Sequence, residues 1–205
     1  LIKPAFSPYG YTKQVGEKIL TDFFKTKPNS SLTLLRYFNP IGAHTSALIG
    51  ELPIGVPSNL VPYITQTGIG KRKKLTVFGK DYDTDDGTCI RDYIHVVDLA
   101  NAHVASLKKG LNSKESIKTY NVGTGKGVSV LEVISAFEKV SNQKLNYEFG
   151  PRRGGDVPEI YSDNELIKTE LGWEAKFSLE DCLEHSWKWE KNLVNFKYKS
   201  EKKQD

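Results

Sequence analysis

The spacing of apolar residues over the first forty positions predicts a helix followed by a strand. The apolar residues that recur every three or four positions are Val15, Ile19, Leu20, Phe23 and Phe24. This spacing is typical of a helix with one buried face. Ser7 precedes it as a side-chain acceptor for the free amides of the first turn, and Pro8 suits the first helical position because no donor is needed there. Leu32–Phe38 is a short apolar run that we expect to form a buried strand.

Apolar runs and helical repeats alternate along the rest of the chain. The runs predict strands at residues 75–78, 93–97, 118–122 and 145–149. Helical spacing predicts helices at residues 98–109, 130–140 and 163–171 and a last helix from residue 178. Asp98 and Ser129 are the expected N-caps of the first two. The stretch from residue 42 to 62 is rich in glycine and proline and is expected to be loop. Strands alternating with helices indicate an α/β fold.

The composition narrows the classes of protein to which the chain can belong. It has 205 residues with 29 basic and 25 acidic side chains, a formal charge of +4, which is too mild to favour a nucleic-acid partner. No run of 18 or more apolar residues occurs, so we expect no contact with a membrane. The only cysteines are Cys89 and Cys182, which favours a reducing compartment, taken here as the cytoplasm. The four histidines are scattered, and no metal site is predicted.

Two pairs of polar residues are candidates for a catalytic or a binding role. Tyr9 and Lys13 stand four positions apart on the first predicted helix and therefore share a face. An ammonium beside a phenol stabilises the phenolate, so such a pair can move a proton, although it can equally be an ordinary exposed pair. Arg91 and Arg153 can each bind a diphosphate through a guanidinium fork. Arg91 beside Asp92 is also compatible with a plain surface ion pair.

Motifs in a fixed order connect these residues to a known family. They are Ser7–Lys13, Arg36–Pro40, Gly42–His44, Pro57–Ile64, Val77–Gly79, Arg91–Ala100, Tyr120–Gly125 and Pro151–Asp156. Together they resemble the extended short-chain dehydrogenase/reductase superfamily and, within it, the UDP-glucose (UDP-galactose) 4-epimerase family. The resemblance covers nearly the whole chain, from Tyr9 to about Leu193.

The resemblance implies an NAD-dependent epimerase that interconverts UDP-glucose and UDP-galactose by transient oxidation at carbon 4. Tyr9 would exchange the proton of the sugar 4-hydroxyl, Lys13 would bind the nicotinamide ribose, and Phe38 would lie beside the nicotinamide. The residues that would bind the UDP-sugar, besides Tyr9, are Asn39, Asn59, Leu60, Thr76, Val77, Phe78, Arg91, Arg153, Gly154, Gly155 and Asp156.

The same resemblance implies a division into two domains. Residues 1–40, joined by residues 88–110, would be the C-terminal portion of a Rossmann-like, doubly wound NAD-binding domain. Residues 41–195 would mainly form a smaller, mixed α/β domain that binds the nucleotide sugar. Residues 196–205 would be a frayed tail.

The glycine-rich turn that holds the NAD pyrophosphate in this family is missing. Gly123–Val128 has valine in place of the third glycine, and we interpret it as a structural turn. We therefore expect the C-terminal part of an enzyme, inactive alone and with its first helix and Leu32–Phe38 left open, whose full-length form is a homodimer. Two alternatives remain: an inert UDP-sugar-binding fragment, and another nucleotide-sugar epimerase or dehydratase of the superfamily.

Overall fold

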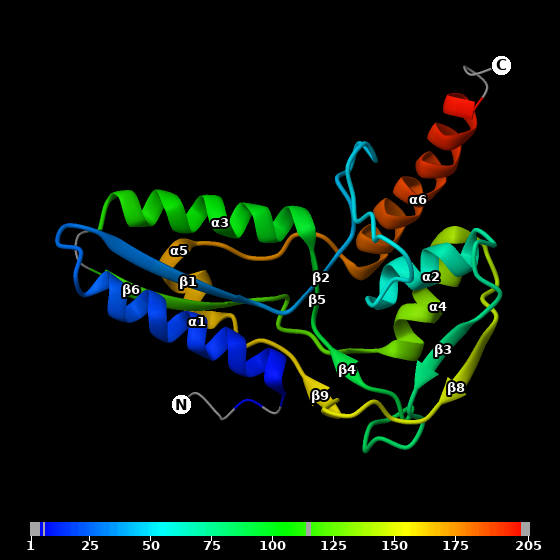
Figure 1. The fold of residues 1–205 in the computed structure, drawn as a ribbon, viewed down its shortest axis with the longest axis horizontal. Helices are drawn as coiled ribbons and strands as arrows, with labels where there is room; N and C mark the ends of the chain where they lie inside the picture. Colours follow the sequence, from blue (N-terminus) through cyan, green and yellow to red (C-terminus); the bar gives the residue numbers. More distant parts are fainter. Residues whose placement is uncertain (1–4, 6, 114–115, 202–205) are drawn as a thin grey trace.

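The computed structural model describes residue 5 and residues 7–113 and 116–201, with side chains through residue 193, and it has a mixed α/β fold (Figure 1). The helices are α1 (Pro8–Phe24), α2 (Leu60–Gly68), α3 (Val96–Leu111), α4 (Val130–Ser141), α5 (Glu165–Leu171) and α6 (Leu179–Glu201). The strands are β1 (Ser31–Tyr37), β2 (Asn39–Ile41), β3 (Leu75–Phe78), β4 (Ile90–Arg91), β5 (Tyr93–His95), β6 (Ser116–Val122), β7 (Val128–Ser129), β8 (Tyr147–Gly150) and β9 (Glu159–Ile160).

One part of the molecule is built on the parallel pair β1 and β6, in which Leu35 lies opposite Tyr120. Figure 1 shows α1 and α3 on opposite sides of this pair. The buried apolar side chains of this part are Ile94, Leu99, Ala102, Tyr120, Val122, Ile167 and Trp173. They come from α3, α5, β5, β6 and the segment after α5, so the core lies between the strands and these helices.

The other part packs α2, α4 and α6 together beside the parallel pair β3 and β8 (Figure 1). Its core includes Ile64, Val77, Val133, Phe137 and Leu183. The predicted capping box is confirmed, since the Ser129 Oγ accepts from the Glu132 amide at 3.0 Å and the Glu132 carboxylate accepts from the Ser129 amide at 2.6 Å. Both first-turn donors are thereby satisfied, which fixes where α4 begins.

The buried Asp92 carboxylate ties three segments together at the centre of the chain. It accepts from the Thr124 amide at 2.9 Å and its hydroxyl at 2.7 Å, from the Gly125 amide at 3.1 Å, and from the Ser162 amide at 3.1 Å and its hydroxyl at 2.7 Å. The Gly123–Val128 loop is therefore a structural turn, as expected. A carboxylate that accepts this many bonds holds β4, the turn and the residues after β9 in one arrangement.

Three predictions about secondary structure are wrong in an instructive way. Asp98 is not the N-cap of α3: its carboxylate accepts from the amides of Lys176 and Phe177 at 2.9 and 3.0 Å, while the His95 Nδ1 caps the helix by accepting from the Val97 amide at 3.0 Å. The loop expected up to residue 62 ends at Asn59, because α2 already begins at Leu60. Pro62 lies in the first turn of α2, where a proline costs no hydrogen bond, so it does not prevent the helix from starting there.

The expected frayed tail is the third difference. Helix α6 continues to Glu201, so residues 196–201 are helical, and residues 202–205 lie outside the described residues. The sequence contains neither glycine nor proline from the start of α6 onward, and nothing in it ends the helix earlier.

The apolar stripe of α1 is open to solvent. None of its residues is buried, and the side chain of Phe23 is 58% exposed. This confirms the expectation that the stripe lies open in the chain as given. Within the described residues, no helix is both long and apolar enough to cross a bilayer.

Candidate functional site

A cavity of about 490 Å³ lies where the two parts of the molecule meet. It is bounded by β2, β3, β4, the first turn of α2 and the segment after β8. The residues expected to bind a UDP-sugar that line it are Asn39, Asn59, Leu60, Thr76, Val77, Phe78, Arg91, Arg153 and Asp156. Residues separated by more than a hundred positions are thus brought to one site.

Two arginines and one carboxylate form the charged side of the cavity. Asp156 lies between them: its Oδ1 is 3.5 Å from the Arg91 Nη2, and its Oδ2 is 3.3 Å from the Arg153 Nε. The Arg91 Nη1 also donates to the carbonyls of Ile90 and Val157, each at 2.8 Å. Arg91 is largely buried and fixed, whereas Arg153 is more exposed. The arrangement presents a preorganised cation next to a movable one, which suits an anionic ligand.

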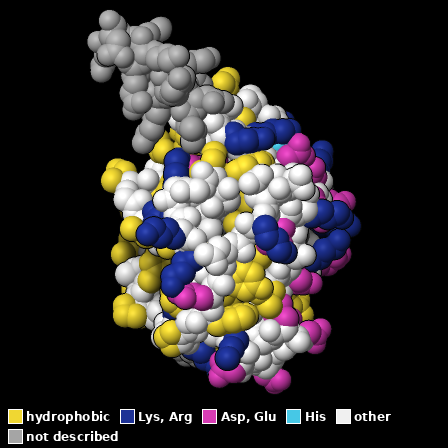
Figure 2. Space-filling view, turned by 90° about the vertical axis from the view of Figure 1, so that its right-hand side faces the viewer, with side chains coloured by type: hydrophobic (Ala, Val, Ile, Leu, Met, Phe, Trp, Pro, Cys, Tyr) yellow, Lys and Arg dark blue, Asp and Glu magenta, His cyan; other side chains and the backbone are white. Residues whose placement is uncertain are grey.

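The edge strand β3 supplies a backbone surface. The Val77 side chain is buried, so only its backbone can reach a ligand, while Phe78 is 41% exposed beside the cavity. The Arg153 guanidinium stands over that ring at 5.2 Å from its centroid. Figure 2, which views the end of the molecule that carries β3 and β8, shows hydrophobic side chains exposed among basic and acidic ones. A planar base could contact the strand here by backbone hydrogen bonds and apolar surface.

The first turn of α2 lines the same cavity. Asn59 occupies the N-cap position without capping the helix through its side chain, and Leu60 and Val61 follow it along the lining. Pro62 has no N–H, so Leu60 and Val61 are the donors of this turn. A helix N-terminus with unpaired amides attracts negative charge, which again suits a phosphate group.

Several lining residues were not predicted, including Glu51, Cys89 and Tyr93. Cys89, Arg91 and Tyr93 alternate along the segment that carries β4 and β5, so their side chains share one face. That alternation was the available signal. Tyr93 is buried, and this burial raises the pKa of its hydroxyl well above the usual range. It stays neutral and can act as a hydrogen-bond donor.

The remaining predicted residues do not line the cavity. Gly154 and Gly155 lie in the exposed turn before Asp156, and Phe38 follows β1 with its amide donating to the Val122 carbonyl at 3.2 Å. Tyr9 and Lys13 lie together on the outer part of α1, with the Lys13 ammonium 5.0 Å from the centroid of the Tyr9 ring. Tyr9 is 70% exposed. The pair is adjacent, as expected, but the described residues do not enclose it.

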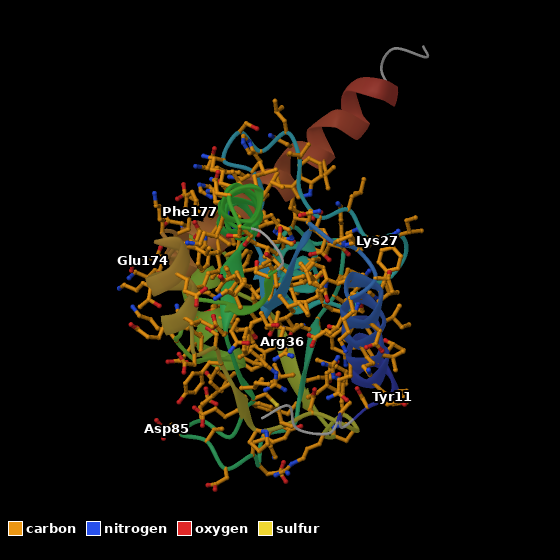
Figure 3. The ribbon with its side chains drawn as sticks, turned by 90° about the vertical axis from the view of Figure 1, so that its left-hand side faces the viewer. Tyr11, Lys27, Arg36, Asp85, Glu174 and Phe177 are labelled. Atoms are coloured by element: carbon orange, nitrogen blue, oxygen red, sulfur yellow. The ribbon has the colours of Figure 1, made fainter. Side chains whose placement is uncertain are left out.

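Helix α1 is nevertheless held in a defined place. The Arg36 guanidinium on β1 donates to both oxygens of Glu17, from Nε at 2.7 Å and from Nη2 at 2.6 Å. This bidentate pair lowers the pKa of the Glu17 carboxyl. Figure 3 shows Arg36 near the middle of the view and Tyr11 at the outer edge of α1. Helix α1, which carries Tyr9 and Lys13, is therefore fixed relative to β1, the strand that leads to Asn39.

The described residues fit a dinucleotide only in part. Tyr9 and Lys13 offer a hydroxyl and an ammonium on one helix face. The one glycine-rich turn that resembles a phosphate-binding loop is filled from within, because its Thr124 and Gly125 amides already donate to Asp92. Among all the residues that the structure describes, no group of His, Cys, Asp and Glu side chains is placed to share a metal ion.

Comparison with known proteins agrees with this geometry. Residues 3–186 match the family model described as GDP-mannose 4,6 dehydratase. The chain is 53% identical to the UDP-glucose 4-epimerase of Bacillus subtilis and 52% identical to that of Haemophilus influenzae, covering 93% and 91% of this chain and 56% and 55% of those proteins. The UDP-glucose 4-epimerase of Bifidobacterium longum, solved with NAD+ and UDP, superposes with a TM-score of 0.90 at 45% identity, over 95% of this chain and 58% of that one. The chain spans little more than half the length of the curated relatives it matches.

Proposed function

Because the chain belongs to the GDP-mannose 4,6-dehydratase family of the extended short-chain dehydrogenases/reductases, we propose that it forms the UDP-sugar-binding part of a UDP-glucose 4-epimerase. The observation that carries the proposal is the single cavity in which the helix N-terminus at Leu60, the edge of β3 and the pair Arg91 and Arg153 converge.

Each wall of the cavity suits one portion of a nucleoside diphosphate sugar. The two guanidinium groups and the free amides of α2 suit the diphosphate. The backbone of β3 suits the edge of the uracil, and Asp156 can accept from ribose hydroxyls. A volume of about 490 Å³ is within the range of small-molecule sites.

The chemistry at the sugar falls to Tyr9 and Lys13. Tyr9 takes the proton of the 4-hydroxyl and later returns it, and the Lys13 ammonium stabilises the negative charge on its oxygen. Lys13 and Phe38 would hold the nicotinamide end of NAD, which would supply the hydride acceptor and donor for carbon 4. Tight contacts to UDP and loose contacts to the sugar allow the sugar to turn between the two transfers.

Further features belong to the same proposal. An epimerase of this kind acts in galactose metabolism in the cytoplasm, forms a homodimer when full length and is inactive when reduced to this part. The open apolar stripe of α1 supports the view that this part needs a covering surface. Two separate buried clusters support a division into two domains, and Ile94, Leu99 and Ala102 belong to the cluster around β1 and β6, as expected if residues 88–110 return to the first domain. The same cluster contains Tyr120, Ile167 and Trp173, so we assign β6, α5 and the segment after α5 to the first domain as well.

Replacing Tyr9 in the full-length enzyme tests the catalytic assignment. Tyr9→Phe removes only the hydroxyl, so conversion of UDP-galactose should fall by at least about a hundredfold while UDP binding is retained. Tyr11→Phe is the matched control, because Tyr11 lies at the outer edge of the same helix (Figure 3) and should leave turnover unchanged. Equal turnover of Tyr9→Phe and the unaltered enzyme would remove Tyr9 from its role.

A further inference from the structure

A segment between β2 and α2 is fastened to helix α6. We call residues 47–56 the strap. The Asn192 Nδ2 on α6 donates to the Ala47 carbonyl at 2.9 Å, and the Trp189 Nε1 donates to the Glu51 carbonyl at 2.8 Å. Gly50 lies flat on the Trp189 ring, since a Cβ at this position would meet the ring at 2.6 Å. The strap therefore has a defined position although much of it is exposed.

The strap reaches the cavity at Glu51 and Val56, and Glu51 is also the residue whose carbonyl Trp189 contacts. Glu51 lines the cavity, and its Oε1 accepts from the Asn59 Nδ2 at 2.7 Å. Asn59 makes no side-chain capping bond to α2, so the carboxamide is oriented by Glu51. One N–H of Asn59 is used in this way, which leaves its second N–H and its Oδ1 available to a ligand.

We propose that Glu51 is a positioning residue of the UDP site: it holds the Asn59 carboxamide toward the ligand, and α6 in turn holds Glu51 through Trp189. The proposal rests on the proposed function, because it assigns Asn59 to UDP binding. It makes a residue of the last helix, 130 positions away from Asn59 in the chain, part of the machinery that shapes the nucleotide site.

The negative charge of Glu51 makes it possible to distinguish a positioning role from a purely electrostatic effect on UDP binding. Glu51 is an acidic residue in a cavity proposed to bind a dianion, so its charge alone opposes UDP. If charge were its main effect, every neutral substitution would strengthen binding. If Glu51 orients Asn59, Glu51→Gln keeps an acceptor for the Asn59 Nδ2 and retains binding, whereas Glu51→Ala weakens it.

The experiment is calorimetric titration of UDP into the chain and its variants, with thermal unfolding measured alongside. We expect Glu51→Ala to bind UDP roughly threefold to tenfold more weakly, the loss typical of one hydrogen bond, at an unchanged unfolding midpoint. Glu51→Gln should bind as tightly as the unaltered chain or more tightly. Trp189→Phe, which removes the Nε1 donor and keeps an aromatic ring, should shift binding in the same direction as Glu51→Ala. Glu184→Ala, on the exposed side of α6, is the matched control and should change nothing.

The outcomes distinguish this inference from the function on which it rests. UDP binding by the unaltered chain together with equal or tighter binding by Glu51→Ala would overturn the positioning role and leave the proposed function intact. A loss of binding in Glu51→Gln equal to that in Glu51→Ala would also overturn it. No binding of UDP by a folded, unaltered chain would overturn the proposed function and the inference with it.

Discussion

The Asp92 carboxylate offers the sharpest test of how the site is held together. The side chain is completely buried and accepts three backbone amides and two hydroxyls, from Thr124, Gly125 and Ser162. Asp92→Ala leaves those donors without their acceptor. A buried donor without a partner costs about 1–3 kcal/mol, and the hydroxyls can turn elsewhere, so the three amides set the cost. We expect the free energy of unfolding to fall by about 3–5 kcal/mol.

The assay is urea unfolding of the chain followed by circular dichroism. Losing about 3–5 kcal/mol removes a large share of the stability of an ordinary domain, so the transition should move to much lower urea. Asp163→Ala is the matched control: this carboxylate is exposed and, within the described residues, accepts from the Glu165 amide alone, at 3.1 Å, so its removal should cost about 1 kcal/mol or less. If Asp92→Ala and Asp163→Ala unfold at the same urea concentration, the buried carboxylate does not organise this region.

Two further predictions concern pH and close packing. Burial and the neighbouring His185 lower the pKa of His95 from 6.5 to about 4. Between those pH values the unfolded chain therefore binds a proton that the folded chain does not. The free energy of unfolding should fall as the pH falls from 6.5 to 4. Urea unfolding across that range should show a shallower dependence for His95→Gln, and an unchanged slope would contradict the assignment. Gly16→Ala should stabilise the chain by about 0.5–1 kcal/mol, because a Cβ in this exposed helix meets nothing within 4 Å. Gly68→Ala should destabilise it by about 1–3 kcal/mol, since the Cβ would lie 2.8 Å from the buried Phe137 ring, and thermal unfolding of the two variants should move in opposite directions.

Local patterns were sufficient where a segment folds by its own chemistry. The capping box at Ser129 and the N-cap at Ser7, whose Oγ accepts from the Gly10 amide at 3.1 Å, follow directly from residue type and spacing. Asp98 and His95 show the limit. Residue type favours Asp98 as the cap, but its carboxylate serves amides at 176–177 that no local pattern connects to it.

The candidate site also contains residues that local sequence predicts and residues whose roles depend on distant contacts. The resemblance identified nine of the residues that line the cavity, and the alternation of Cys89, Arg91 and Tyr93 could have added two more. Glu51 could not have been found in this way, because its role depends on the contact between the strap and α6. The spacing of Tyr9 and Lys13 predicts that they are adjacent. The exposure of Tyr9, in contrast, depends on which other segments pack against α1, and the local sequence does not show this.

Titration of UDP into the purified, folded chain tests the central claim most directly. We expect saturable binding of one UDP per chain, weakened roughly tenfold to a hundredfold by Arg91→Ala because a charged hydrogen-bonding group is lost from the cavity. Absence of binding by the unaltered chain, or binding that Arg91→Ala leaves unchanged, would contradict it.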